Sequence, residues 1–282
     1  MRPRGAWGFR TWPLSARIGA AMFSALAIGS ALVCLFSSWS AWDGDDVHGQ
    51  LADGRPVGPG MVHWLGTDRL LRDVALRLAM ATLHSMHLTL VACALTGLIA
   101  ISLGCAAGYF EQRWLDKCVQ WTLDVMLGFP SILLLMAAGS VLRRVDTSSM
   151  AALIAAVSWP WMTTTIRARA IEISRMDFVQ GVRALGARDA HILLRHVIPN
   201  VAPVAMRLLA LSVAPMTLLE AALAYVGVGR PPPAPTLGRM LYEGQDAMMG
   251  APWLVLAPAL VLTWVGVSTT LLSNALVAQR RS

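Results

Sequence analysis

Six long apolar runs, separated by polar segments, limit what this chain can fold into. An α-helix needs about 20 apolar residues to cross a lipid bilayer. Lipid offers no partner for backbone N–H and C=O groups, so runs of this length are expected to cross as helices. The expected spans cover approximately residues 18–36, 86–109, 119–142, 149–167, 201–226 and 253–277.

The composition agrees with a membrane protein. Hydrophobic residues make up 56% of the chain and charged residues only 14%, whereas soluble domains carry roughly 25% charged residues. The predicted fold class is therefore all-α, a polytopic transmembrane helical bundle of about six spans. The four cysteines lie in or beside apolar runs without a CxxC pair, which favours small buried side chains over a disulfide or metal framework.

The expected organisation is a short arm, one separate span, a long loop, a core of five further spans and a tail. The first apolar run has basic residues before it but no small-x-small cleavage site, so we expect a retained span rather than a signal peptide. The ranges are 1–17 for the arm, 18–36 for the span, 37–85 for the loop, 86–277 for the core with a polar segment at 168–200, and 278–282 for the tail.

Arginines predict the orientation of the chain. They gather in the N-terminal arm, the 168–200 segment and the tail, which six spans would place on one side. The positive-inside rule makes that side cytoplasmic, while most acidic residues fall in the outer loops. The net charge of +7 is thus explained by topology and does not indicate nucleic-acid binding.

The chain lacks the motifs of several enzyme classes. Its single lysine, Lys117, is not in a glycine-rich loop, so the chain cannot hydrolyse ATP through a P-loop. We also find no H-E-x-x-H motif, no nucleophile elbow and no cluster of acids. His84 and His87 lie one helical turn apart, but two imidazoles without a third ligand favour interfacial histidines over a metal site.

A short helix is predicted within the 168–200 segment. Asp177 is expected to cap it, with Gln180 reaching back as in a capping box. The spacing i, i+4, i+7 places Phe178, Val182 and Leu185 on one exposed face.

The same segment predicts a stop and a second helix. Gly186 is expected to end the first helix in the left-handed conformation. Asp189 is expected to cap a second helix that ends at Pro199, because proline removes a backbone donor. From periodicity alone, an ordinary basic loop is about equally favoured.

The 168–200 segment resembles the cytoplasmic coupling loop, or EAA loop, of bacterial ABC importer permeases. Residues 178–186 match aromatic-Val-Glu-Ala-Ala-Arg-Ala-Leu-Gly, with Gln180-Gly181-Val182 in place of Glu-Ala-Ala, and residues 196–200 match His-Ile-Leu-Pro-Asn. The resemblance implies that a short helix contacts an ATPase subunit through Asp177, Phe178, Val179, Gln180, Gly181, Val182, Arg183, Ala184, Leu185 and Gly186.

A second signature lies in the first long loop. Residues 63–73 resemble the His-Trp-Leu-Gly-Thr-Asp-x-x-Gly-Arg-Asp pattern of dipeptide, oligopeptide and nickel permeases, with Leu71 in place of the last glycine. We expect Asp68 and Asp73 to be helix caps or to form an ion-paired turn with Arg69 and Arg72. This structural role is favoured over contact with the substrate.

Some residues within or next to the expected spans are candidates for hinges or for the transport pathway. Intramembrane acids are often functional, although local pairing of Asp124 with Lys117 or Gln120 is slightly favoured. Glu220 is expected either to face the pathway or to bond to a broken backbone nearby, with neither favoured. The full set of candidates is Asp124, Pro130, Pro199, Asn200, Pro215 and Glu220.

Together these resemblances imply one permease subunit of a dipeptide/oligopeptide/nickel-type ABC importer, with a type I permease fold, in the bacterial inner membrane. They imply four partners: a second, homologous permease, two ATPases and an extracytoplasmic binding protein. No cofactor is expected on this chain, since ATP and Mg would bind the ATPases. The mechanism implied is alternating access, with spans three and five tilting about Pro130 and Pro215.

Two alternatives remain open at this point. One is an importer of nickel or a metal–chelator complex with the same architecture. The other is a secondary transporter that uses Asp124 and Glu220 as ion sites, although such proteins usually contain inverted repeats, and we find no convincing internal repeat.

Overall fold

The computed structural model describes residues 13–37, 41–45, 48–51, 56–141 and 146–278. In these ranges the chain is helical and contains no strand, so the all-α prediction is confirmed. Its elements are α1 (Leu14–Phe36), α2 (Val74–Tyr109), α3 (Trp114–Gly128), α4 (Ser131–Val141), α5 (Thr147–Ser174), α6 (Asp177–Ala184), α7 (Asp189–Ile192), the π-helix η2 (Leu193–Val197), α8 (Ile198–Tyr225), α9 (Leu237–Gln245) and α10 (Trp253–Ala278).

Four helical stretches in the described part are long and apolar enough to cross a membrane: Leu14–Phe36, Val74–Tyr109, Asp189–Tyr225 and Trp253–Ser273. The bent pair α3 and α4 adds a fifth if it is counted as one span. The remaining expected span lies in α5, which has 28 residues but is rich in Ser and Thr and contains Pro160 and two arginines. The number six therefore stays a prediction.

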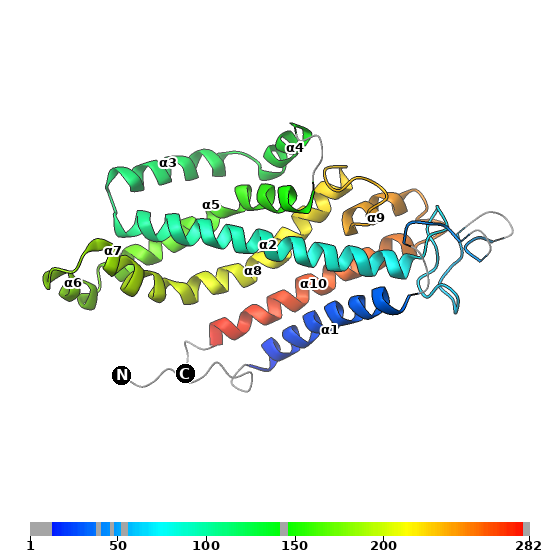
Figure 1. Ribbon diagram of the computed structural model, residues 1–282, viewed down its shortest axis with the longest axis horizontal. Helices are drawn as coiled ribbons and strands as arrows, with labels where there is room; N and C mark the ends of the chain where they lie inside the picture. Colours follow the sequence, from blue (N-terminus) through cyan, green and yellow to red (C-terminus); the bar gives the residue numbers. More distant parts are fainter. Residues whose placement is uncertain (1–12, 38–40, 46–47, 52–55, 142–145, 279–282) are drawn as a thin grey trace. The chain divides into compact units, whose positions relative to one another are not determined.

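The third expected span is not one continuous helix. α3 ends at Gly128 and α4 begins at Ser131, and the two helices meet at an angle of 88° (Figure 1). Pro130 lies at this break, since its ring and missing N–H are incompatible with a helix interior. We expected a kink at Pro130, and the structure has a sharper feature, a broken span or re-entrant loop.

The chain forms two compact units. The first contains Met1–Met86, Val213–Val226 and Pro232–Ser282, and the second contains His87–Ser212 and Gly227–Pro231. α2 and α8 each contribute residues to both units.

In the first unit, α1 and α10 pack side by side (Figure 1). Gly19 allows the close approach, because a Cβ atom there would lie only 2.5 Å from the Ser268 carbonyl oxygen and the Leu272 nitrogen. The Trp264 indole Nε1 donates a hydrogen bond of 2.9 Å to the Met22 carbonyl oxygen, which fixes the register of the pair.

The start of α2 corrects a predicted boundary. We expected the second span to begin at residue 86, but α2 begins at Val74, where Asp73 accepts a 2.8 Å hydrogen bond from the Leu76 amide. The predicted capping role of Asp73 is thus confirmed. The early boundary was missed because the first turns of α2 contain Arg77, whose side chain is buried and paired rather than exposed.

In the second unit, α2 packs against α5 through glycines. A Cβ atom on Gly104 would lie 2.7 Å from the Ile166 side chain, and one on Gly108 would lie 2.5 Å from the Arg167 carbonyl oxygen. The Gly104-x-x-x-Gly108 pair therefore serves packing within the chain, as small residues do between helices in lipid.

We predict that Gly108→Leu destabilises the protein by about 1–3 kcal/mol, because the new side chain must displace the α5 backbone. The matched control is Gly266→Leu, since Gly266 also lies within a helix and has no atom within 4 Å of an added Cβ. The unfolding midpoint in mild detergent should fall for the first variant only. Equal midpoints for the two variants would contradict the packing described for Gly108.

Candidate coupling site

α6 begins one residue earlier than the capping prediction required. Its N-cap is Met176, which has no capping side chain, so the predicted capping box of Asp177 and Gln180 is wrong. Asp177 instead lies in the first turn, where its charge is favourable to the helix dipole. Gln180 does reach back, but its Nε2 donates a 2.8 Å hydrogen bond to the Ser174 carbonyl oxygen at the end of α5. The amide thereby ties α6 to α5.

The end of α6 confirms the prediction for Gly186. This residue has φ +81°, in the left-handed region. The Gly186 amide donates to the Arg183 carbonyl oxygen at 3.0 Å, and the Ala187 amide donates to the Val182 carbonyl oxygen at 3.4 Å. This pair of bonds is a Schellman motif, in which glycine is preferred because it has no Cβ atom.

The predicted apolar face of α6 is divided between solvent and core. Phe178 is 44% exposed and Leu185 is 88% exposed, whereas Val182 packs against the interior and Val179 is fully buried. α6 thus presents Phe178 and Leu185 outward while Val179 and Val182 hold it in place.

A buried apolar cluster lies beneath the 168–200 segment. It joins side chains from α2, α5, α6, α7, η2 and α8, so the short helices share a core with the long ones. Its members include Ile173, Val179, Ile192, Val197, Val201 and Ala205. Burial of these side chains stabilises the position of α6, by about 1.5–3 kcal/mol for each large one.

The helix after Gly186 does not end at Pro199 as predicted. α7 begins after the N-cap Arg188, passes through the π-turn η2 and continues as α8 to Tyr225. The Ile198 amide donates to the Leu193 carbonyl oxygen, five residues back, and this wider spacing accommodates a proline without ending the helix. Asn200 Nδ2 donates to the His196 carbonyl oxygen at 2.6 Å, which satisfies a backbone acceptor beside the proline.

Asp189 also has a different role from the one predicted. Its carboxylate accepts a 2.6 Å hydrogen bond from the Tyr109 hydroxyl at the end of α2, rather than capping α7. The Arg183 guanidinium lies over the Tyr109 ring, 5.3 Å from its centroid. These contacts link the 168–200 segment to α2.

A buried ion pair holds the start of α3 to the end of α5. Asp116 is fully buried, and its carboxylate accepts hydrogen bonds of 2.5 Å from Arg167 Nε and 2.8 Å from Arg167 Nη2. The Gln112 amide and the Gln120 side chain donate to the same carboxylate. Sequence reasoning missed this pair because its members are 51 residues apart and no periodicity relates them.

The outer surface of the segment is apolar and basic. A shallow hollow of about 450 Å3 is lined by Ala190, His191, Leu194, Arg195 and Pro199. Leu194 is 65% exposed, so the surface combines an apolar side chain with a guanidinium and an imidazole. Such a surface suits a partner that covers apolar groups and supplies negative charge.

Comparison with known proteins decides the family. Residues 99–282, about two thirds of the chain, match the family described as binding-protein-dependent transport system inner membrane component. The chain belongs to this family. The match includes the whole 168–200 segment, so the predicted resemblance is confirmed at the level of the family.

Three relatives illustrate the similarity. The glutathione transport system permease protein GsiD of Pectobacterium atrosepticum is 30% identical over 222 residues, 78% of this chain and 72% of the relative. The dipeptide transport system permease protein DppC of Alkalihalophilus pseudofirmus is 30% identical over 223 residues, covering 79% and 72%. GsiD of Escherichia coli is 31% identical over 266 residues, covering 91% and 83%.

The protein is thus a permease subunit of an ABC importer and a multi-pass component of the inner membrane. It works with other components of the transporter, and the ATPase activity belongs to those partners rather than to the permease. Family membership decides against an ion-coupled secondary transporter and against a membrane enzyme.

The remaining candidate residues of the permease lie outside the 168–200 segment. Asp124 is exposed on α3, and one of its expected partners, Gln120, bonds to Asp116 instead. Pro215 is exposed within an unbroken α8. Glu220 is buried and accepts a 2.8 Å hydrogen bond from the Ser85 hydroxyl. Of the six hinge or pathway candidates, only Pro199 and Asn200 lie in the same 168–200 segment as α6.

We predict that Gly186→Val destabilises the end of α6 by about 1–2 kcal/mol, because a side chain is disfavoured at positive φ. The control is Gly181→Ala, since Gly181 lies within α6 and has open space around an added Cβ. Limited proteolysis in detergent should cleave the first variant faster near residues 175–190 and leave the second unchanged. Equal cleavage rates would contradict the role given to Gly186.

We predict that Asp116→Asn destabilises the permease by about 3 kcal/mol, because it leaves the Arg167 charge without its buried partner. The control is Asp124→Asn, which makes the same chemical change at an exposed position of α3. Unfolding midpoints in detergent should fall for the first variant only. A similar midpoint for both would show that the pair contributes no net stability.

Proposed function

We propose that this permease forms half of a translocation pathway for peptides or a similar small solute. The relatives named above carry the words dipeptide and glutathione in their names, and a further relative, 29% identical, is the oligopeptide transport system permease protein OppC of Mycobacterium tuberculosis. These names favour a peptide-like solute over nickel or a metal–chelator complex.

The proposed partners are a second, homologous permease, two ABC ATPases that bind ATP and Mg, and an extracytoplasmic substrate-binding protein. We place the 168–200 segment and both termini in the cytoplasm, because arginines concentrate in these parts of the chain. α9 and the long loop after α1 then lie on the extracytoplasmic side.

The observation that carries the proposal is that α6 buries one set of its apolar side chains and exposes another. Val179 is fully buried in the cluster, while Leu185 and Phe178 remain exposed. Exposed apolar side chains on a rigidly held short helix favour insertion into a groove of a partner. In this proposal the groove belongs to an ATPase.

The proposed mechanism is alternating access. ATP binding brings the two ATPases together and moves α6, and the shared core transmits the movement to α5 and α8. The break at Pro130 and the proline at Pro215 are the proposed points of tilting, because neither residue supplies a backbone N–H. Hydrolysis on the ATPases returns the pathway to its first state.

The test is to purify the permease in mild detergent from cells that express the whole transporter and to identify the co-purifying proteins by mass spectrometry. We predict that P-loop ATPases and a second permease accompany the wild-type chain. Leu185→Asp should reduce the ATPases at least tenfold, because a carboxylate would be desolvated in the apolar groove.

The control is Met249→Asp, which places the same charge at a fully exposed position of the first unit. It should retain both partners at the wild-type level. Co-purification of ATPases with the Leu185→Asp variant at the wild-type level would contradict docking through α6. A wild-type chain that purifies alone would overturn the proposed assembly.

A further inference from the structure

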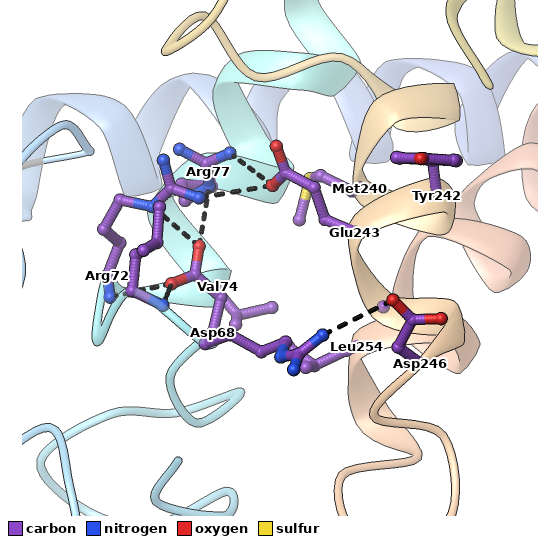
Figure 2. A pocket seen from close by; sticks show the side chains of 12 residues that line it. Asp68, Arg72, Val74, Arg77, Met240, Tyr242, Glu243, Asp246 and Leu254 are labelled. Atoms are coloured by element: carbon purple, nitrogen blue, oxygen red, sulfur yellow. Dashed lines mark hydrogen bonds and ion pairs between the residues drawn. The ribbon is translucent and has the colours of Figure 1, made fainter. Parts of the chain in front are cut away.

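A pocket of about 320 Å3 lies in the first unit, between the residues that precede and begin α2 and the α9–α10 region. Figure 2 shows charged side chains from both parts pointing toward one another around it. Its floor is apolar, because Val74, Met240 and Leu254 belong to a buried cluster. The pocket is distinct from the 168–200 segment, which lies in the second unit.

One wall of the pocket consists of buried charges. Arg72 and Arg77 are 5% and 1% exposed, and both bind Glu243 Oε2 through Nη2 at 3.2 Å. Arg72 Nε also donates to Asp68 Oδ2 at 2.8 Å, as Figure 2 shows. The predicted ion-paired turn between Asp68 and Arg72 is therefore confirmed, while Arg69 instead faces Asp246 at 3.5 Å.

The carboxylates in this wall have little capacity left. Asp68 Oδ1 accepts from the amides of Leu70 and Arg72, and its Oδ2 faces Nε of both Arg72 and Arg77. Glu243 Oε2 is shared by the same two arginines, and its Oε1 accepts from Arg239 Nε at 2.7 Å. A carboxylate offers about four acceptor sites, so these two acids are nearly saturated.

The guanidinium groups, by contrast, retain donors. Arg72 carries five N–H groups, and its bonds to other described residues use only Nε and Nη2, which leaves both N–H groups on Nη1. Three guanidinium groups, those of Arg69, Arg72 and Arg77, line the pocket together with three carboxylates, those of Asp68, Glu243 and Asp246. Arg239, which does not line the pocket, binds the remaining oxygen of Glu243, so the carboxylates are occupied while Arg72 retains donors.

A ligand that completes this arrangement supplies an acceptor with negative charge. A carboxylate matches the planar fork of a guanidinium and forms charge-assisted hydrogen bonds with it. The apolar floor favours a ligand that also carries an apolar group over a small inorganic anion.

We propose that this pocket binds the carboxylate of a small solute that also carries an apolar side chain, with Arg72 as the main donor. The placement of this pocket at the extracytoplasmic entrance, and the choice of a peptide-like solute, rest on the proposed function. The binding of a carboxylate to the pocket does not depend on that function, because binding is measured on the full permease chain without partners or uptake.

The probe is N-acetyl-leucine, and the matched comparison is N-acetyl-leucinamide, which has the same side chain but no charge. Binding to the purified permease in lipid nanodiscs is measured by equilibrium dialysis of the labelled compounds. We expect N-acetyl-leucine to bind at least tenfold more tightly than the amide. Equal affinities, or no binding of either compound, would overturn the proposal.

Two variants locate the site. Arg72→Gln should weaken the binding of N-acetyl-leucine at least tenfold. Because loss of Arg72 also disturbs a buried network, Leu70→Trp provides an independent test that leaves every charge in place. Leu70 lines the pocket but is 63% exposed, so a larger side chain there fills the opening without entering the core. It should weaken binding as well.

The controls are Arg188→Gln and Met249→Trp, which make the same changes at exposed positions that do not line the pocket. They should bind N-acetyl-leucine like the wild-type permease. Binding that survives both Arg72→Gln and Leu70→Trp would place the site elsewhere and overturn the proposal. If N-acetyl-leucine does not bind and the Arg72→Gln variant also fails to associate with the binding protein, the proposal is overturned. The pocket would then receive an acidic side chain of that binding protein instead.

Discussion

A polar group that is buried, in the bilayer or in the protein core beside it, must find its hydrogen-bond partners within the chain. That constraint explains how α8 starts. Pro199 lacks an N–H and would end an ordinary helix, but η2 shifts the hydrogen-bond spacing and the Asn200 amide supplies a donor to the His196 carbonyl. The helix therefore continues from the 168–200 segment into a membrane-spanning length, and this segment stays joined to a transmembrane element without a loop.

The same constraint governs the charged side chains. In the second unit Asp116 is buried only because Arg167 and two glutamine donors surround it. In the first unit Arg77 is buried against Asp68 and Glu243. The Asp116–Arg167 and Arg77–Glu243 pairs join segments that are distant in sequence, so removing one partner would both break a link and leave a buried charge unpaired.

Much of the fold could be predicted because local rules and the bilayer agree. Glycine at the left-handed end of α6, Asp73 at the start of α2 and a change of direction at Pro130 all follow from backbone chemistry, although the change at Pro130 is a break rather than the predicted kink. The failures arise where distant contacts override local preference. Proline rules alone cannot foresee a π-turn before Pro199, and no sequence pattern relates Asp116 to Arg167. For α6, periodicity identified the apolar residues but not that Val182 faces the core while Leu185 faces solvent.

The seam between α1 and α10 has a consequence for the order of synthesis. The Trp264 indole and its acceptor, the Met22 carbonyl, are 242 residues apart. At roughly 5–20 residues per second, α1 waits about 10–50 s in the membrane before α10 emerges. Throughout that interval the surface around Gly19 must be covered by lipid or by another protein. The first helix of the described chain thus obtains its partner in the bundle only when translation is almost finished.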